Sequence, residues 1–311
     1  MSYQDQRAWR DIQTFLPVEF QIPEGSEPTE EWWEHRGHRL HLDTYRNPSA
    51  PAKVILFHGV GTNGRQMSMI LGRPLALRGY ETIAIDMPGY GVTEIADGAL
   101  VKYDDWVQIG SDLIERERDG RPIVLYGLSA GGMETFHVAG LNGDVAGIVG
   151  MTFLDQRIAK VRRDTAHDPV TALFTPLVVA ASNTSLRRAR LPMKLVSKMQ
   201  TLVNNRALKR VFYRDKTSAG NSASIEFLAS YLNYQPALEP EDFAVCPVLL
   251  TQPADDRWTP LELSTPTLEK IAKVSVTTVM LENAGHYPVE QPGLDQMVNA
   301  ISSFVEKVAS D

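Results

Sequence analysis

One short segment of the sequence carries the residue types of a nucleophilic site. The segment Gly127–Gly131, which reads Gly-Leu-Ser-Ala-Gly, follows the apolar run 123–126 and precedes a segment with a helical pattern. A serine at a sharp turn from strand to helix has an exposed hydroxyl, and only small neighbours let the strand and the helix pack so closely. The sequence therefore predicts Ser129 as a nucleophile that attacks a carbonyl carbon.

A serine hydroxyl is a weak nucleophile that needs a base beside it, and the chain offers seven histidines. His286 lies just after the apolar run 274–281, so a loop at the end of a strand would present its imidazole. We therefore expect His286 to be the base. Other histidines are expected within a helix, within an insertion, or facing solvent near edge strands: His137, His167, His35, His38 and His41.

The base in turn needs a carboxylate that fixes its tautomer and stabilises the imidazolium. Asp256 follows the apolar run 248–250 and precedes Pro260, where a helix is expected to begin. Asp255 in the same loop remains an alternative, and so does Asp155, which ends the strand before a long insertion. With Asp256, the chain order is serine, acid, histidine.

Two backbone N–H groups are expected to stabilise the oxyanion that forms during attack on a carbonyl. One belongs to Ala130, the residue after the nucleophile. The other belongs to Val60, whose flanking glycines in His58–Gly61 leave the backbone accessible. Trp258, close to the predicted acid, is a candidate for lining the substrate pocket. No histidine or cysteine cluster has the spacing of metal ligands, so we expect neither a metal nor a cofactor.

The elements that must position these residues alternate along the chain. Continuous apolar runs bounded by turn residues are typical of strands buried on both faces of a parallel sheet. They occur at 54–57, 82–85, 123–126, 148–151, 248–250 and 274–281, with helical patterns at 67–78, 106–118, 133–139, 261–272 and 297–308. The segments 18–22 and 40–45 alternate apolar and polar residues and predict an antiparallel pair at one edge. We predict an α/β fold with a mostly parallel eight-stranded sheet flanked by helices.

Residues 155–240 break this alternation and predict a helical cap subdomain inserted after the sixth strand, because so long a stretch is not a loop. The core would then comprise 1–154 and 241–311. From Asp155 to Gly220 there are 14 Lys and Arg against 4 Asp and Glu, a net charge of +10, which leaves −17 for the rest. A solvated basic surface on an acidic body accounts for this asymmetry, and a basic cap that meets an anionic carrier protein or an anionic lipid surface remains the alternative. The apolar cap residues suit an acyl chain and equally suit packing of the cap on itself: 173–174, 177–179, Leu191, Met193 and Met199.

The composition is that of an ordinary globular protein. The chain has 311 residues, 43% hydrophobic and 22% charged, and a net charge of −7 that argues against nucleic acid as a partner. The start of the chain lacks a signal-peptide pattern, and no apolar run is long enough for a membrane span. With Cys246 as the single cysteine, we expect a cytoplasmic protein without stable membrane insertion. The sequence gives no indication of oligomeric state.

These motifs together resemble the α/β-hydrolase superfamily, and within it the lysophospholipase- and monoacylglycerol-lipase-like serine carboxylesterases. The matching pieces are His58–Gly61, Asp86–Gly91, Gly127–Gly131, Asp256 with Pro260, and Gly285 with His286. The sequence departs from the family pattern at Ala130, where many members carry a bulkier residue, and at Gln252, where the acid loop usually begins with glycine.

The resemblance implies a serine hydrolase that cleaves a carboxylic ester of a small or medium acyl substrate through an acyl-enzyme. It also implies that 155–240 covers the active site and that the turn 86–91 is mainly structural. A lactonase acting, for example, on an acyl-homoserine lactone uses the same attack, and so does an acyl thioesterase. A lyase that uses the triad, or a ligand receptor on the same fold, is the non-hydrolytic alternative.

We expect Ser129→Ala to abolish turnover, by a factor of about 10⁴ or more, and to leave folding intact because only one oxygen atom is removed. Ester hydrolysis and thermal unfolding of both proteins measure the two effects. A fluorophosphonate probe should label the wild-type protein at Ser129 and leave the variant unlabelled. Full activity in the variant would exclude Ser129 as the nucleophile.

Overall fold

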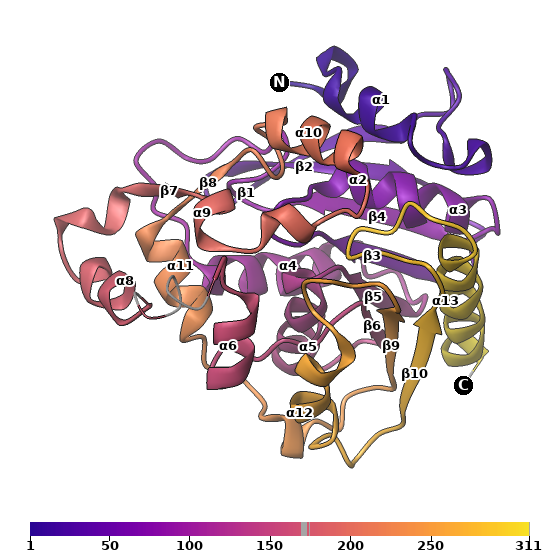
Figure 1. The fold of residues 1–311 in the computed structure, drawn as a ribbon. Helices are drawn as coiled ribbons and strands as arrows, with labels where there is room; N and C mark the ends of the chain where they lie inside the picture. Colours follow the sequence, from indigo (N-terminus) through magenta and orange to yellow (C-terminus); the bar gives the residue numbers. More distant parts are fainter. Residues whose placement is uncertain (169–172, 174, 311) are drawn as a thin grey trace.

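A single eight-stranded sheet lies at the centre of the computed structural model, which describes residues 1–168, 173 and 175–310 (Figure 1). The strand order is β1-β2-β4-β3-β5-β6-β9-β10, and β2 pairs antiparallel with both β1 and β4 while the other pairs are parallel. The strands are β1 Thr29–His35, β2 His38–Tyr45, β3 Lys53–Phe57, β4 Glu81–Asp86, β5 Ile123–Gly127, β6 Gly147–Gly150, β9 Val248–Pro253 and β10 Val276–Leu281. The predicted mostly parallel eight-stranded sheet is confirmed.

One of the two predicted edge strands is wrong. The segment 18–22 forms a short 3₁₀ turn, Val18–Phe20, and the strand that pairs with β2 is β1. Pro17 directly precedes this turn, and a second proline follows at 23; a proline has no N–H to donate to a strand ladder. Phe20 and Ile22 pack on the core, whereas Val18 is exposed.

Helices cover both faces of the sheet (Figure 1). α4 packs against α5 on one face, and α3 packs against α13 on the other. The helices of the core are α1 Ala8–Gln13, α2 Gly64–Met67, α3 Arg73–Ala76, α4 Tyr103–Glu117, α5 Ala130–Asn142, α12 Thr265–Leu268 and α13 Gly293–Ser310.

Two predicted helices are interrupted, each near a proline. The helix expected over 67–78 is divided between α2 and α3 by a π-helical turn, Ser68–Gly72, that ends just before Pro74. The helix expected over 261–272 is reduced to a 3₁₀ turn and α12, which has Pro266 in its first turn. A proline lacks the N–H that would bond to the carbonyl four residues earlier, so the regular helical ladder restarts there.

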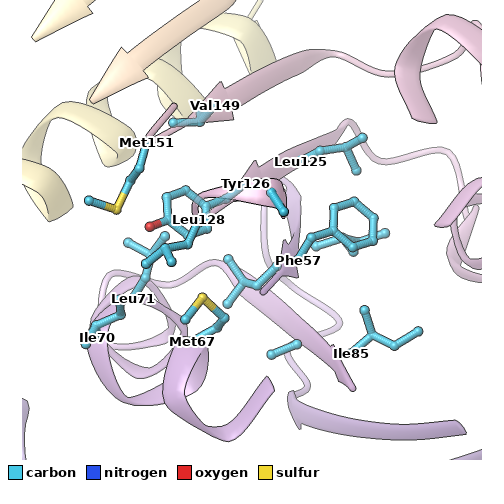
Figure 2. Close-up of a cluster of buried hydrophobic side chains, with 14 of the residues drawn as sticks. Phe57, Met67, Ile70, Leu71, Ile85, Leu125, Tyr126, Leu128, Val149 and Met151 are labelled. Carbon is cyan, nitrogen blue, oxygen red and sulfur yellow. The ribbon is translucent and has the colours of Figure 1, made fainter. Parts of the chain in front are cut away.

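The core beneath the site is apolar and closed to water. Figure 2 shows buried side chains of β3, β5 and β6 gathered beside Met67, Ile70 and Leu71 of the helical segment after β3. These three side chains, Phe57 and Tyr126 are all fully buried. Burial of such side chains contributes about 1.5–3 kcal/mol each, so the sheet and the helices that carry the site form one rigid support.

The insertion, residues 155–240, connects β6 to β9 and is mainly helical. It also contains a short antiparallel ribbon of β7 and β8, which the sequence did not predict. Its elements are α6 Ala159–Thr165, α8 Thr175–Ser182, β7 Arg190–Pro192, α9 Met193–Val196, α10 Arg206–Arg214, β8 Ser222–Ser224 and α11 Ile225–Leu232.

An ion-pair clasp joins the two ends of the insertion. The guanidinium of Arg157 donates to both carboxylate oxygens of Glu239 at 2.7 Å and also to both oxygens of Asp155. Paired parallel bonds of this kind give geometric specificity as well as attraction. The two ends of the insertion are therefore held together, and the chain then crosses to the other end of the sheet, where β9 begins parallel to β6.

A network of buried charges lies under the antiparallel edge. His41, expected to face solvent, is fully buried between Asp86 at 3.0 Å and Glu30 at 3.0 Å. Burial acts to lower the pKa of His41, but these carboxylates raise it to about 10, so the imidazole is charged at neutral pH. Beside it, Arg65 donates to both oxygens of the buried Asp43, at 2.5 and 2.9 Å.

Asp86 connects this network to the loops at the site. Its carboxylate accepts hydrogen bonds from the N–H of Gly64 at 2.7 Å, from the N–H of Val92 at 3.0 Å and from the hydroxyl of Tyr3 at 3.0 Å. Gly64 begins α2 directly after the loop that carries Val60. The buried carboxylate thus holds the loops after β3 and β4 to each other.

We expect Arg65→Leu to lower the free energy of unfolding by about 3–5 kcal/mol, because Asp43 would remain buried without its partner. Changing both residues to leucine should recover most of that loss. Arg36→Leu is the control, since Arg36 pairs with Asp112 at the surface and its loss should cost about 1 kcal/mol or less. Urea unfolding with an unchanged slope measures each value. Equal losses at Arg65 and Arg36 would contradict the role of the buried pair.

Candidate active site

The residues singled out in the sequence lie on four loops, each of which follows the carboxyl end of a parallel strand. In a parallel sheet the carboxyl ends of neighbouring strands lie together. Val60 follows β3, Ser129 follows β5, Asp256 follows β9 and His286 follows β10. The chain passes from β3 to β4 on one side and then to β5 on the other, so a crevice is expected where these loops diverge.

Ser129 occupies a strained turn between β5 and α5. Its φ of 57° and ψ of −121° lie outside the regions that residues with a side chain normally adopt. The turn requires glycine at 127, where an added Cβ would lie 1.9 Å from the carbonyl oxygen of Gly131. The strand and the helix therefore meet backbone to backbone, and the serine side chain is left at the tip of the turn.

His286 and Asp256 form a buried pair. His286 Nδ1 lies 2.9 Å from Asp256 Oδ2, and both side chains are almost completely buried. The hydroxyl of Thr259 donates to Asp256 Oδ2 at 2.8 Å and lies 3.1 Å from His286 Nδ1. The proton on Nδ1 is thereby held between Asp256 and Thr259, and the other nitrogen, Nε2, has no hydrogen-bond partner among the described residues.

The Asp256 carboxylate is ionised at neutral pH. Burial acts to raise the pKa of Asp256, but the facing charge of His286 and the hydrogen bonds from His286 and Thr259 lower it to about 2. The N–H groups of Trp258 and Thr259 also donate to Oδ1 at 2.8 Å each. The carboxylate is therefore fixed in orientation as well as in charge.

The two alternative acids have other surroundings. The side chain of Asp255 is exposed, and its backbone N–H bonds to the carbonyl of Ala284. The carboxylate of Asp155 is occupied by Arg157. In the described part of the chain, Asp256 is the only one of these three aspartates that forms a hydrogen bond with His286.

The loop after β3 lies against the turn at Ser129. An added Cβ at Gly59 would lie 2.7 Å from Ser129 Cβ, which shows how closely the two backbones approach. His58 fixes this loop: its Nε2 accepts the N–H of Met87 at 3.0 Å, so its Nδ1 carries the proton and donates to the carbonyl of Gly59 at 3.0 Å. Burial lowers the pKa of His58, which favours this neutral form.

The two predicted oxyanion donors remain available. Neither the N–H of Val60 nor that of Ala130 donates to another group in the described part of the chain. Both residues are nearly buried, so the N–H dipoles lie where little water screens them.

A cavity of about 230 Å³ opens beside Ser129, and it is lined mainly by apolar side chains. The core contributes Val60, Trp258 and Thr259, and the insertion contributes most of the rest. Insertion residues at this surface include Val178, Leu191, Met193, Val196, Phe227 and Leu228. Met199, also expected near the acyl site, is instead fully buried beside Gly61, while Phe174 lies outside the described residues.

Trp258 forms one wall of the cavity and contacts His286. Its ring centroid lies 4.7 Å from that of His286 at an interplanar angle of 39°, and its Nε1 donates to the carbonyl of Thr165 in α6. The indole therefore excludes water from one side of the imidazole and links the insertion to the site.

Three polar residues at this site were not singled out in the sequence: Thr259, Gln156 and Arg162. Thr259 contacts both members of the buried pair, while Gln156 and Arg162 line the cavity from the insertion. The indication of Thr259 in the sequence is its position next to Pro260, in the loop that carries Asp256. Nothing in the spacing of Gln156 or Arg162 indicates a cavity, because that depends on how the insertion packs.

Within the described ranges, no group of three or more His, Cys, Asp or Glu side chains is arranged so that it could hold a metal ion. None of the helices in the same ranges combines the length and the apolar character needed to cross a lipid bilayer.

The sequence matches the model of the alpha/beta hydrolase family over residues 54–295. This match covers most of the chain and spans all four loops of the site, so the chain belongs to the alpha/beta hydrolase family. The sequence-based resemblance is thereby confirmed. A search of the curated proteins found no match.

Solved structures share the fold at low sequence identity. A monoacylglycerol lipase from Paleococcus ferrophilus is 20% identical with a TM-score of 0.67, covering 86% of this chain and 99% of that one. A soluble variant of monoglyceride lipase from Saccharomyces cerevisiae, in complex with a substrate analogue, is 16% identical with a TM-score of 0.72, covering 94% and 99%. The carboxylesterase CesB from Bacillus subtilis is 16% identical with a TM-score of 0.60, covering 97% and 96%. At these identities the likeness shows a common fold.

We expect Asp256→Asn to lower kcat by about 10³–10⁴-fold, because an amide can donate to Nδ1 and so leave the proton on Nε2, where the base is needed. Initial rates with an activated ester, together with thermal unfolding, measure the effect. Asp255→Asn is the matched control in the same loop and should retain activity within about twofold. A larger loss in Asp255→Asn or in Asp155→Asn than in Asp256→Asn would show that the acid is misassigned.

Proposed function

We propose that the protein is a serine hydrolase that cleaves a carboxylic ester of a small or medium acyl group through an acyl-enzyme. The observation that carries the proposal is a buried His286–Asp256 pair with a free Nε2 at the same sheet edge as Ser129, which lines an apolar cavity. A base oriented by a carboxylate beside a serine at a strained turn is the arrangement that activates a hydroxyl for acyl transfer.

In the proposed first step, the Ser129 hydroxyl attacks the ester carbonyl while His286 Nε2 takes its proton. Asp256 stabilises the imidazolium that results, and its lowered pKa keeps it charged throughout. The N–H groups of Val60 and Ala130 stabilise the oxyanion. The bond to the alcohol oxygen then breaks, and His286 returns the proton to the departing alcohol.

In the second step, water attacks the acyl-enzyme. His286 accepts a proton from the water, the bond between acyl carbon and Ser129 Oγ breaks, and the serine recovers its proton. The balance is one ester and one water converted to one acid and one alcohol. These two reaction steps require neither a metal nor a cofactor.

The cavity supports the choice of substrate size. Its volume of about 230 Å³ lies below the roughly 300–1,000 Å³ common for drug-sized ligands, and its lining is apolar. An acyl chain of small or medium length matches both properties. The insertion supplies most of this lining, which supports its role as the cap over the site.

We also propose that the protein is cytoplasmic. Cys246, the single cysteine, is buried, so the fold uses no internal disulfide and is compatible with a reducing cytoplasm. A small acyl ester is the partner that we propose.

We expect hydrolysis rates to favour carboxylic esters over matched lactones and thioesters and to peak at a small or medium acyl length, because longer chains exceed the cavity. Initial rates across the three series, each with Ser129→Ala as control, provide the measurement, and mass spectrometry after rapid quenching should detect an acyl group on Ser129. A preference for lactones or thioesters would show that the proposed substrate class is wrong, while the proposal that Ser129 is the nucleophile would stand. No turnover and no fluorophosphonate labelling would favour a lyase or a receptor.

A further inference from the structure

One cation lines the cavity without a counter-charge. Arg162 on α6 belongs to the lining together with Ser129 and Trp258, and its side chain is partly buried. Its guanidinium makes no hydrogen bond or ion pair with any described residue. No Asp or Glu occurs among the described residues that line the cavity. Arg162 is thus a cationic residue of a largely apolar lining, and its donors have no partner among the described residues.

The neighbouring cations on the same stretch of chain are all paired. Lys160 and Arg163 both bind Asp164, at 2.7 and 2.9 Å, and Arg157 binds Asp155 and Glu239. Arg162 is therefore the exception on α6. The nearest acid in the helix, Asp164, is already shared by two cations, so the arrangement leaves Arg162 free for a group that comes from outside.

Two further polar residues, Gln156 and Tyr231, line the same cavity. Gln156, which is buried, donates from Nε2 to the hydroxyl oxygen of Tyr231 at 3.4 Å, and its Oε1 accepts from Thr165 at 3.4 Å. The Tyr231 hydroxyl donates to none of the described residues. The described lining thus contains two groups that can donate hydrogen bonds to an anion, the Arg162 guanidinium and the Tyr231 phenol, and no carboxylate.

We propose that the substrate is an ester that also bears a free carboxylate, and that Arg162 binds this carboxylate while Ser129 attacks the ester carbonyl. The inference rests on the proposed ester hydrolysis and narrows its substrate class. A guanidinium matches a carboxylate with two parallel hydrogen bonds, and a partly buried pair is screened less by water than one at the surface. The largely apolar lining of the cavity suits the methylene groups that would connect the ester and the carboxylate.

The carboxylate can belong to the acyl part or to the alcohol part of the ester, and two substrate series distinguish these sources. The first series contains 4-nitrophenyl monoesters of dicarboxylic acids of graded length, each matched with its methyl diester. The second contains butanoate esters of ω-hydroxy acids, each matched with the methyl ester of the same acid. Within each pair the methyl ester lacks the charge and carries one additional methyl group. Because this size difference is the same for every protein tested, the change in the acid-to-methyl-ester ratio of kcat/KM between the wild type and an Arg162 variant isolates the contribution of the anion.

In the wild-type protein, one of the two series should favour the acid over its methyl ester by about 10- to 100-fold, mainly through KM. Arg162→Gln should bring this ratio close to one, and Arg162→Lys, which keeps the charge and loses the bidentate geometry, should retain part of it. Arg163→Gln is the matched control, because Arg163 is the adjacent, exposed arginine and does not line the cavity; its ratio should equal that of the wild type. Thermal unfolding of each variant checks the fold.

Failure of this inference and failure of the proposed function give different results. If methyl esters and acids are hydrolysed with the same ratio by the wild type and by Arg162→Gln, the carboxylate inference is overturned, while turnover that depends on Ser129 still supports an ester hydrolase. If no ester in either series is hydrolysed and Ser129 is not labelled by a fluorophosphonate, the proposed function fails and the inference fails with it. A loss of acid preference in Arg163→Gln equal to that in Arg162→Gln would also overturn the assignment.

Discussion

The register between β3 and β5 is the constraint on which the site depends. Phe57 pairs with Gly127, so both strands end at the same level and their loops leave the sheet side by side. The same rule operates further along the sheet, where Pro253 of β9 pairs with Leu281 of β10 and backbone bonds continue the pairing into both loops. A slip of one residue in either pair would separate groups that must be in contact, because consecutive side chains point to opposite faces. The buried helices behind the sheet keep this register fixed.

Much of the sheet could be predicted because buried parallel strands have a strong local signature. The apolar run 123–126 lies within β5, and the run 54–57 lies within β3. The predicted elements are wrong where a local pattern of apolar and polar residues is compatible with more than one structure. The alternation at 18–22 suits a short turn as well as a strand, and proline at 266 restarts a helix that periodicity alone extends. Such cases are decided by backbone hydrogen bonding, which hydrophobic patterning does not report.

At the site, the sequence indicated the reactive residue types, but not the groups that act through contacts between distant segments. Gly127–Gly131 and the loops after the last two strands are local motifs and could be recognised. The burial of His41 depends on carboxylates at 30 and 86, and Arg162 reaches the cavity because α6 packs beside Trp258. Neither relation has a fixed spacing in the chain. These features belong to tertiary packing, and a structure is needed to find them.

The clasp between Arg157 and Glu239 has an evolutionary consequence. We propose that the 86-residue insertion (155–240), whose two ends are joined by this clasp, is a separate cap subdomain whose interior can vary more than the strands on either side. The proposed reacting groups belong to the sheet loops, whereas most of the cavity wall belongs to the insertion. Substitutions in the insertion would therefore alter which substrate is recognised and leave the proposed reacting groups in place.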